Sequence, residues 1–383
     1  MALAFALSGT LCKGADTGLT VKGEFSRDSS RPIPISISGF GGEALRVLSF
    51  DLEVAGCRIT PESQAAFRVS GRFTTRLEGY LADSDKKFLL SRAYNSSNQR
   101  AAAHAFADEL IPLITGSPGI TRTRIAFKSA TRGRSEIYFA DYDGHNAIPA
   151  TRDGVITTAP SWGLGNSHLF YTSYKLNNPD IVSQNIGTRQ RKILARYSGS
   201  NLTPVPSPDG TKLAMVLSKS GSPNLYVAGI DGSKPRQITF SSRGVATPTW
   251  SPDSQWICYT SRESGPARLY KIRASGGQAT RISVIGAYNA TEPDWSPDGK
   301  WIAFTTSGGG SGFTICIVPA GGGSAERFTE GEDPSWAPNS RTLMFVKRRR
   351  DQSYYLSLLD AVTKQVKDVP LNLGNISQPA WAR

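Results

Sequence analysis

Histidines and cysteines have the widest catalytic chemistry in this 383-residue chain, because imidazoles and thiolates bind metals and act as bases or nucleophiles. The three histidines, His104, His145 and His168, do not stand at the spacing of a metal-ligand set or beside a nucleophile. The cysteines include no Cys-x-x-Cys pair; they are Cys12, Cys57, Cys258 and Cys316. No Gly-x-Ser-x-Gly motif of a serine hydrolase occurs. The sequence therefore predicts no metal, no cofactor and no catalytic residue.

Carboxylates recur in Ser-Pro-Asp-Gly segments or close variants, at Asp209, Asp253 and Asp298. Proline presets the bend, aspartate accepts hydrogen bonds from nearby backbone, and glycine supplies positive φ, so each segment predicts a hairpin turn. This chemistry explains the carboxylates without acid–base catalysis, and we expect that the protein is not an enzyme.

The turns belong to a repeat marked by the phrase Pro-x-Trp. Successive copies are 44, 44, 45, 41 and 45 residues apart, and proline replaces the tryptophan in one of them. An apolar run follows the first five phrases about seven residues later. A period of about 40 to 45 residues is typical of four-stranded propeller blades. The copies are Pro160-Ser-Trp162, Pro204-Val-Pro206, Pro248-Thr-Trp250, Pro293-Asp-Trp295, Pro334-Ser-Trp336 and Pro379-Ala-Trp381.

The two ends of the repeat complement each other. The apolar run Ile125-Ala-Phe127 has no Pro-x-Trp before it, and Pro379-Ala-Trp381 has no strand after it. We infer that the C-terminal strand completes the first blade, which gives an all-β six-bladed propeller over residues 121–383 without open edges.

Residues 31–118 have a different pattern and predict a small α/β domain. A strand over 31–38 precedes a helix over 43–55, a hairpin turns near 83–86, and a second helix spans 98–114. In that helix Asn98 is the expected cap, and Ala102, Ala105, Phe106, Leu110 and Leu113 are expected to face inward.

The first 30 residues predict two further segments. Residues 1–15 resemble the apolar core of a secretory signal without its charged leader, a truncated signal segment, although a buried N-terminal strand gives the same pattern. Residues 16–30 are polar and contain glycine and serine, and we expect a mobile tail. The sequence contains no run of about 18 apolar residues, so we expect no membrane insertion.

Positive charge is concentrated in the repeat half of the chain. The whole chain has a net charge of +13, and residues 121–383 hold 31 basic against 19 acidic residues. Such a field favours an acidic protein or an anionic envelope carbohydrate as partner. No basic run alternates with stacking aromatics, so we expect no nucleic acid. The dense cluster Lys347-Arg-Arg-Arg350 is expected in a solvated hairpin turn.

The residue before each Pro-x-Trp is the candidate for recognition. In a propeller the loop into each innermost strand opens at one mouth of the central channel, and loops carry specificity. These positions differ while the scaffold residues agree; they are Ala159, Thr203, Thr247, Glu292, Asp333 and Gln378. We expect them to form a binding rim at the end of these loops.

The chain resembles the TolB family of the Tol-Pal envelope system. The particular motifs are the junction Thr121-Arg-Thr-Arg-Ile-Ala-Phe127 and Asp141-Tyr-Asp-Gly-His-Asn146, with Arg31-Pro-Ile33, Ser218-Lys-Ser-Gly221 and Pro379-Ala-Trp381 in support. The resemblance implies a monomeric, non-catalytic periplasmic scaffold that supports outer-membrane integrity and constriction at division. Propellers that bind anionic envelope carbohydrate, or hydrolases and lyases without a recognisable motif, are the alternatives.

The resemblance also implies partners and their sites. The lipoprotein Pal binds at the propeller mouth, the N-terminal tail communicates with TolA, and other envelope proteins are further candidate partners. The implied Pal-binding residues are Thr203, Arg243, Thr247, Tyr288, Asn289, Glu292, Glu332, Asp333 and Gln378. The implied tail residues are Asp16, Val21, Lys22, Glu24, Phe25 and Ser26.

Overall fold

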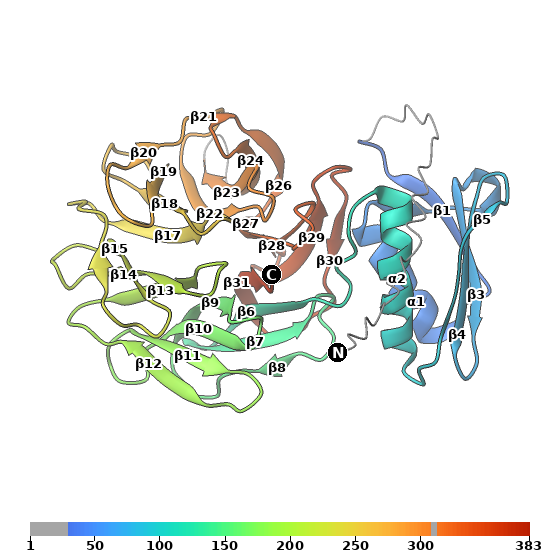
Figure 1. The fold of residues 1–383 in the computed structure, drawn as a ribbon, viewed down its shortest axis with the longest axis horizontal. Helices are drawn as coiled ribbons and strands as arrows, with labels where there is room; N and C mark the ends of the chain where they lie inside the picture. The colour runs from blue at the N-terminus through green and yellow to red at the C-terminus, as the bar shows by residue number, and fades with distance from the viewer. Residues whose placement is uncertain (1–29, 308–311) are drawn as a thin grey trace, which may run out of the picture.

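The structure is a computed structural model that describes residues 30–307 and 312–383. An α/β region stands beside a β-propeller, and helices α1 (Gly42–Val54) and α2 (Gln99–Thr115) lie between its sheet and the propeller (Figure 1). The expected signal segment and nearly all of the expected tail lie outside the described residues.

The α/β region has one sheet in the order β2-β1-β3-β4-β5. Strand β1 pairs in parallel with β2 and β3, and the remaining pairs are antiparallel. Its elements are β1 Ile33–Ser38, α1 Gly42–Val54, β2 Cys57–Ile59, a 3-10 turn Glu62–Gln64, β3 Phe67–Phe73, β4 Leu77–Asp83, β5 Phe88–Tyr94 and α2 Gln99–Thr115.

Helix α2 forms where the sequence predicts it. The Asn98 side chain accepts a hydrogen bond from the backbone N–H of Ala101 at 3.0 Å, which caps the first turn. Gly116 ends the helix in the left-handed conformation at φ 74°. One expected inward residue is wrong: Leu113 is 47% exposed, because the sheet and propeller cover other faces of the last turn.

The propeller has six four-stranded blades within the described residues. From the innermost strand outward, blade 1 consists of β31 Asn375–Trp381, β6 Arg124–Thr131, β7 Arg134–Asp141 and β8 Ile148–Pro149, and blade 2 of β9 Thr157–Gly163, β10 His168–Ser173, β11 Asp180–Asn185 and β12 Arg191–Ala195. Blade 3 consists of β13 Asn201–Pro206, β14 Lys212–Leu217, β15 Asn224–Gly229 and β16 Arg236–Gln237, and blade 4 of β17 Val245–Trp250, β18 Trp256–Ser261, β19 Arg268–Arg273 and β20 Thr280–Arg281. Blade 5 consists of β22 Ala290–Trp295, β23 Trp301–Ser307, β24 Phe313–Pro319 and β26 Glu326–Glu330, and blade 6 of β27 Glu332–Trp336, β28 Thr342–Arg348, β29 Tyr354–Asp360 and β30 Val366–Asp368. Strands β21 Val284–Ile285 and β25 Gly323–Ser324 form a separate parallel pair.

The C-terminal strand closes the ring as expected. Strand β31 pairs antiparallel with β6, with Trp381 opposite Ile125 and Ala380 opposite Ala126. Each of the six phrases lies in an innermost strand, and the tryptophans of the five that have one are buried. The apolar clusters join neighbouring blades; one contains Trp250 with Ala214 and Val216 of the preceding blade. Packing between blades therefore supplies the core.

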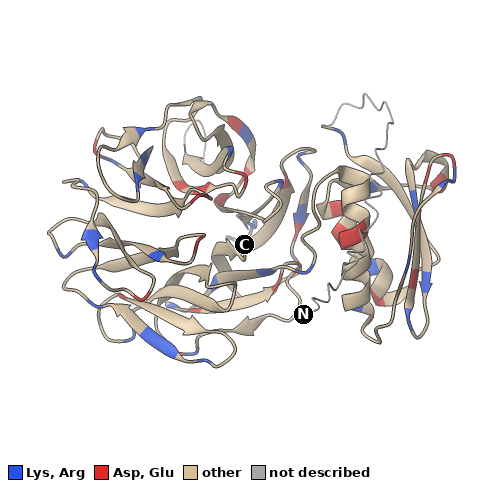
Figure 2. Cartoon of the chain, in the orientation of Figure 1, with Lys and Arg blue, Asp and Glu red and all other residues tan. Residues whose placement is uncertain are grey.

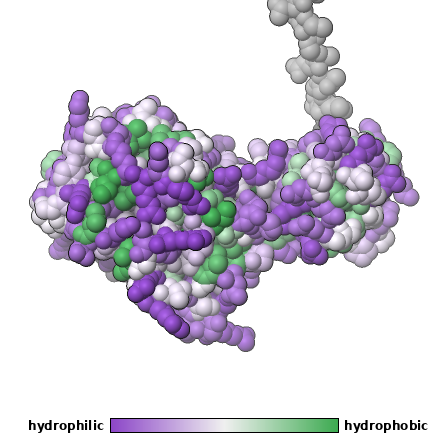
Figure 3. Space-filling view, turned by 90° about the horizontal axis from the view of Figure 1, so that it is seen from below, coloured by the Kyte–Doolittle hydropathy of each residue, from purple (hydrophilic) through white to green (hydrophobic). Residues whose placement is uncertain are grey.

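Basic residues are spread over the strands and turns of the blades (Figure 2). On the face seen in Figure 3, apolar side chains reach the surface in separate groups among polar ones. The basic cluster lies only partly in the predicted turn: Lys347 and Arg348 end β28, and Arg349 and Arg350 begin the turn to β29. Arg349 lies over the ring of Tyr355 at 4.6 Å.

Candidate functional site

The six positions before Pro-x-Trp come together around one cavity of about 750 Å³ in the propeller channel. Its lining includes Ala159, Thr203, Thr247, Glu292, Asp333 and Gln378. The sequence placed them at the ends of loops, whereas the structure places each inside an innermost strand, because those strands begin earlier than the proline suggests.

The backbone has the same unusual conformation at all six positions. Each is in the left-handed region: Ala159 at φ 52°, Thr203 at 46°, Thr247 at 48°, Glu292 at 53°, Asp333 at 54° and Gln378 at 51°. The strand pairing shifts register at these points, as a β-bulge does. Two of the residues are threonines, which are β-branched and rarely adopt positive φ. Strained positions of this kind cluster at functional sites, and here they surround the channel.

Three rim side chains also connect neighbouring blades. Glu292 Oε2 accepts a hydrogen bond from the N–H of Asp333 at 3.1 Å, and Asp333 Oδ2 accepts one from the N–H of Gln378 at 2.9 Å. Gln378 Oε1 accepts one from the N–H of Ala159 at 2.9 Å. Ala159 has no side-chain oxygen, and Thr172 Oγ1 instead accepts from Thr203 N–H at 3.2 Å. These rim groups therefore hold blades 5, 6, 1 and 2 together at the mouth.

The carboxyl groups are concentrated at blades 5 and 6. Burial and the neighbouring Glu292 carboxylate raise the pKa of Asp333 to about 8, against the hydrogen bond from Gln378. Burial, followed by the same Glu292 charge, raises the pKa of Glu332. Among the described residues, no ion pair within 4 Å involves Glu292, Glu332 or Asp333. Burial and the Glu292 charge therefore both favour the protonated form of the Asp333 carboxyl.

A second ring of hydrogen bonds lies one step further along the innermost strands. In blades 4, 5 and 6 the middle residue of Pro-x-Trp accepts from the backbone N–H at the tryptophan position of the next blade, with blade 1 following blade 6. The pairs are Thr249 with Trp295 at 3.2 Å, Asp294 with Trp336 at 2.7 Å and Ser335 with Trp381 at 3.0 Å. Proline at position 206 has no N–H, and the Ser161 hydroxyl instead donates to the carbonyl of Pro204 at 2.5 Å. A hydrogen bond between the same two innermost strands thus replaces the one that Pro206 cannot make.

Arg383 lines the cavity together with the Pro-x-Trp strands. Its guanidinium donates from Nε to the Trp336 carbonyl at 3.0 Å and from Nη1 to the Trp295 carbonyl at 3.1 Å. Its Nη2 contacts the Asp294 carboxylate. These partners lie toward the ends of β22 and β27, so Arg383 occupies the side of the cavity away from the rim.

The other expected binding residues do not line this cavity. Tyr288 and Asn289 line a second cavity of about 450 Å³ with Arg262 and Ser307. Tyr288 is 67% exposed, and Arg268 lies over its ring at 5.3 Å. Asn289 is committed to loop structure, since it accepts from Ala267 N–H at 2.9 Å and donates to Ser307 Oγ at 2.8 Å.

Two expected residues stand elsewhere at the same end of the blades. Glu332 lies beside Asp333 at the start of β27, and exposed Arg243 precedes β17. The expected tail residues Asp16, Val21, Lys22, Glu24, Phe25 and Ser26 lie outside the described part of the chain.

Exposed apolar residues of this end were missed. Phe240 is 83% exposed in the turn before β17, and Leu176 is 42% exposed in the turn between β10 and β11. Both turns open at the end of the blades where the innermost strands begin. A large apolar residue in a polar turn is the signal that could have identified them.

The α/β region contacts the other end of the propeller. It contacts Tyr142, which follows β7, and Arg341, which lies in the turn between β27 and β28. Both positions are at the end of the blades where the innermost strands finish. The rim therefore stands at the end of the propeller that the α/β region leaves uncovered.

The described residues contain no group of three or more histidine, cysteine or acidic side chains placed to hold a metal ion. Within the same ranges, no helix is long and apolar enough to cross a membrane. Cys57, Cys258 and Cys316 are free and buried, and the two in the propeller pack as small apolar residues, as expected.

Comparisons with known proteins agree with the fold. The family described as "TolB beta propeller domain" matches residues 112–383. The chain is 33% identical over 319 residues to the Tol-Pal system protein TolB of Bordetella pertussis, covering 81% of this chain and 72% of that protein. It is 30% identical to the protein TolB homolog of Chlorobium luteolum, covering 64% of this chain and 56% of that protein.

A solved structure has the same architecture. The crystal structure of TolB from Acinetobacter baumannii superposes with a TM-score of 0.84 at 22% identity, covering 92% of this chain and 97% of that one. This likeness concerns the fold. Together with the family match over most of the chain, the Bordetella relative establishes that the protein belongs to the TolB family.

Proposed function

We propose that the protein is a non-catalytic, periplasmic scaffold of the Tol-Pal system, which binds the lipoprotein Pal at the rim of the propeller channel. The observation that carries the proposal is the ring of six positive-φ positions around the cavity, at the uncovered end of the propeller. Exposed Tyr288 and Phe240 stand at the same end and supply the kind of aromatic contact that dominates protein interfaces.

The proposal includes a role for the N-terminal tail. Residues 16–26 would engage TolA, and the two binding events would be coupled if the tail has different affinities for the Pal-bound and free forms. Deletion of residues 16–26 should then change the affinity for Pal. An unchanged affinity would remove this part of the proposal. The physiological consequence would be support of outer-membrane integrity and constriction at division.

Binding of the soluble domain of Pal, measured by isothermal titration calorimetry, tests the proposed site. We expect Tyr288→Ala to weaken binding by roughly 10-fold or more, as loss of an aromatic anchor does. Glu332→Lys should also weaken binding, because its side chain stands at the mouth and its charge is reversed. The matched control is Phe88→Ala, which truncates a 69% exposed aromatic residue on β5 of the α/β region. Equal affinities for all three variants would place the site elsewhere.

A second candidate function is binding of an anionic envelope carbohydrate at the turn between β28 and β29. The observation that favours it is the group Lys347 to Arg350, in which Arg348 and Arg349 lie over Tyr354 and Tyr355. Pull-down from an envelope extract with mass spectrometry separates the two functions. Retention of carbohydrate that Arg349→Glu abolishes would favour this candidate, and retention of protein alone would favour Pal.

A further inference from the structure

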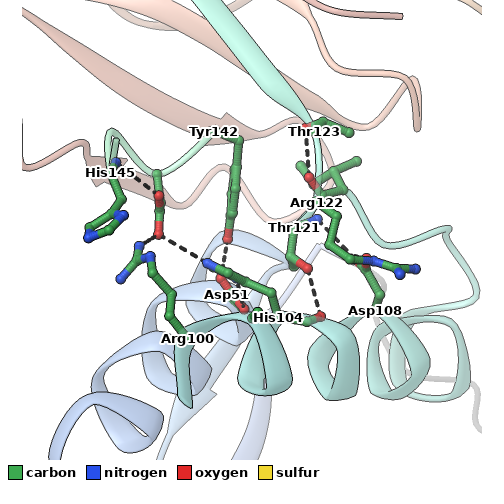
Figure 4. Close-up of polar contacts among 12 residues, drawn as sticks. Asp51, Arg100, His104, Asp108, Thr121, Arg122, Thr123, Tyr142 and His145 are labelled. Carbon is green, nitrogen blue, oxygen red and sulfur yellow. Dashed lines mark hydrogen bonds and ion pairs between the residues drawn. The ribbon is translucent and has the colours of Figure 1, made fainter. Parts of the chain in front are cut away.

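The contact between the α/β region and the propeller contains a buried imidazole with a carboxylate at each nitrogen (Figure 4). His104 of α2 is 6% exposed. Its Nδ1 lies 2.8 Å from Oδ2 of Asp51 in α1, and its Nε2 lies 3.4 Å from Oδ2 of Asp143 in the turn after β7. The second contact has the distance of an ion pair, and the described residues give Nε2 no hydrogen-bond partner. One ring thus connects the two parts of the molecule.

The turn that carries Asp143 has a fixed shape. Asp143 Oδ1 accepts from the N–H of His145 at 3.1 Å, and Gly144 has a φ of 85°. A side chain on Gly144 would meet Val369 and Leu371 at 2.8 Å, so glycine is required there. The motif Asp141-Tyr-Asp-Gly-His-Asn146 therefore holds one carboxylate against the His104 ring, which gives it a structural role at this contact.

The other groups around the ring are accounted for. Tyr142 donates its hydroxyl to Oδ1 of Asp51, and Arg100 of α2 pairs with Asp143. Asp108 of the same helix pairs with Arg122 at 2.8 Å. Within the part of the chain that the structure describes, His104 is the one basic side chain that pairs with Asp51. Asp51 is fully buried, and a buried carboxylate requires a counterion or protonation.

A neutral imidazole cannot satisfy both carboxylates. It has one N–H, so whichever nitrogen keeps the proton, the other presents a lone pair to a negative oxygen. The doubly protonated ring donates from both nitrogens and supplies the charge that Asp51 lacks. We propose that Asp51, His104 and Asp143 form a proton-dependent latch, which holds the α/β region on the propeller while the ring is doubly protonated and loosens when one proton is lost.

The direction of the pH effect follows from the proton balance. Burial raises the pKa of Asp51, and the hydrogen bond and charge of His104 oppose this. The raised value applies to Asp51 in the folded protein relative to the free side chain. Docking itself adds the Asp143 carboxylate beside Nε2, which favours the doubly protonated ring over the neutral ring, so docking is favoured at lower pH and weakens as pH rises. Imidazoles ordinarily change charge between about pH 5 and pH 8, which sets the interval to examine.

Two measurements on the full chain test the latch. The first is NMR of the ring carbon–proton pairs, because the chain has three histidines and the variants His145→Gln and His168→Gln assign the other two. The second is amide hydrogen exchange of residues 99–115 and 138–146 at pH 6 and pH 8.5, corrected for the intrinsic rates. Peptides of blade 4 are the internal control.

We expect protection of both segments to fall by about 10-fold or more between the two pH values in the wild type, together with deprotonation of His104. In His104→Gln the change should be absent, because the amide does not titrate, while His168→Gln should behave as the wild type. In Asp143→Asn, which keeps the shape of the turn, His104 should lose its proton at a lower pH than in the wild type. The same pH profile in His104→Gln as in the wild type, or an unmoved ring titration in Asp143→Asn, would overturn the proposal. The test is independent of Pal binding.

Discussion

Ser335 offers the sharpest test of how the blades are joined. It is 6% exposed, and its Oγ accepts the N–H of Trp381 at 3.0 Å, across the seam where β31 closes the ring. Ser335→Ala removes this acceptor and leaves the side-chain volume nearly unchanged. The N–H of Trp381 is then buried without a partner, which costs about 1–3 kcal/mol of stability. We expect the free energy of unfolding to fall by that amount.

Urea unfolding followed by tryptophan fluorescence measures this difference. Ser335→Thr keeps a hydroxyl at the same position and should recover most of the loss. Ser91→Ala, on the exposed surface of β5, removes a hydroxyl from solvent and should change stability by less than about 0.5 kcal/mol. If Ser335→Ala is as stable as Ser91→Ala, the second ring of hydrogen bonds does not hold the closing strand, and the reasoning is refuted.

Two further predictions concern buried charge. Arg341 pairs with Asp360 at 2.7 and 2.9 Å. Asp360→Ala leaves the buried guanidinium without a counterion and should lower the free energy of unfolding in urea by about 3–5 kcal/mol. A loss below about 1 kcal/mol, which is the size expected for an exposed pair, would contradict the buried arrangement. The pKa of Asp333 is raised to about 8, so its contribution to stability is present at low pH and is lost as pH rises from about 4 to about 8. Asp333→Asn keeps an oxygen for the Gln378 N–H and should reduce the loss of stability between pH 5.5 and pH 8.5; an unchanged loss would mean that the carboxyl is already ionised across this range.

The repeat could be predicted from sequence because each blade uses the same local chemistry. Pro-x-Trp, the Asp-Gly turns and the apolar runs all recur at one interval, so the errors of a single assignment are corrected by the other copies. The closure was predictable because the repeat shows what each end lacks: the run at Ile125 has no Pro-x-Trp before it, and the phrase ending at Trp381 has no strand after it. Helix α2 was predictable because Asn98 and Gly116 are strong local signals at its ends.

The conformation of the rim could not be predicted in this way. A positive φ at Thr203 or Thr247 is opposed by local preference and is imposed by the bulge, which depends on pairing with the neighbouring strand. The connection from Glu292 to Asp333 depends on the packing of two blades. The differences among the six rim residues of this chain therefore reflect hydrogen bonds between blades as well as any role in recognition.

The contact around His104 was out of reach for a different reason. Asp51, His104 and Asp143 come from α1, α2 and the propeller, and no sequence spacing relates them. Leu113 was expected inside because the helical stripe includes it, but the last turn of α2 is covered on other faces. Local patterns thus identified the elements, while the orientation of the α/β region on the propeller depends on contacts between distant segments.

The proposed function requires that the rim of the channel binds Pal. Amide hydrogen exchange of the full chain, with and without the soluble domain of Pal, tests it most directly. We expect Pal to increase protection at the starts of the innermost strands and the adjacent turns, including residues 286–292 and 330–334, with no gain on the sheet of the α/β region. Protection confined to that sheet, or to the turn between β28 and β29, would contradict the account.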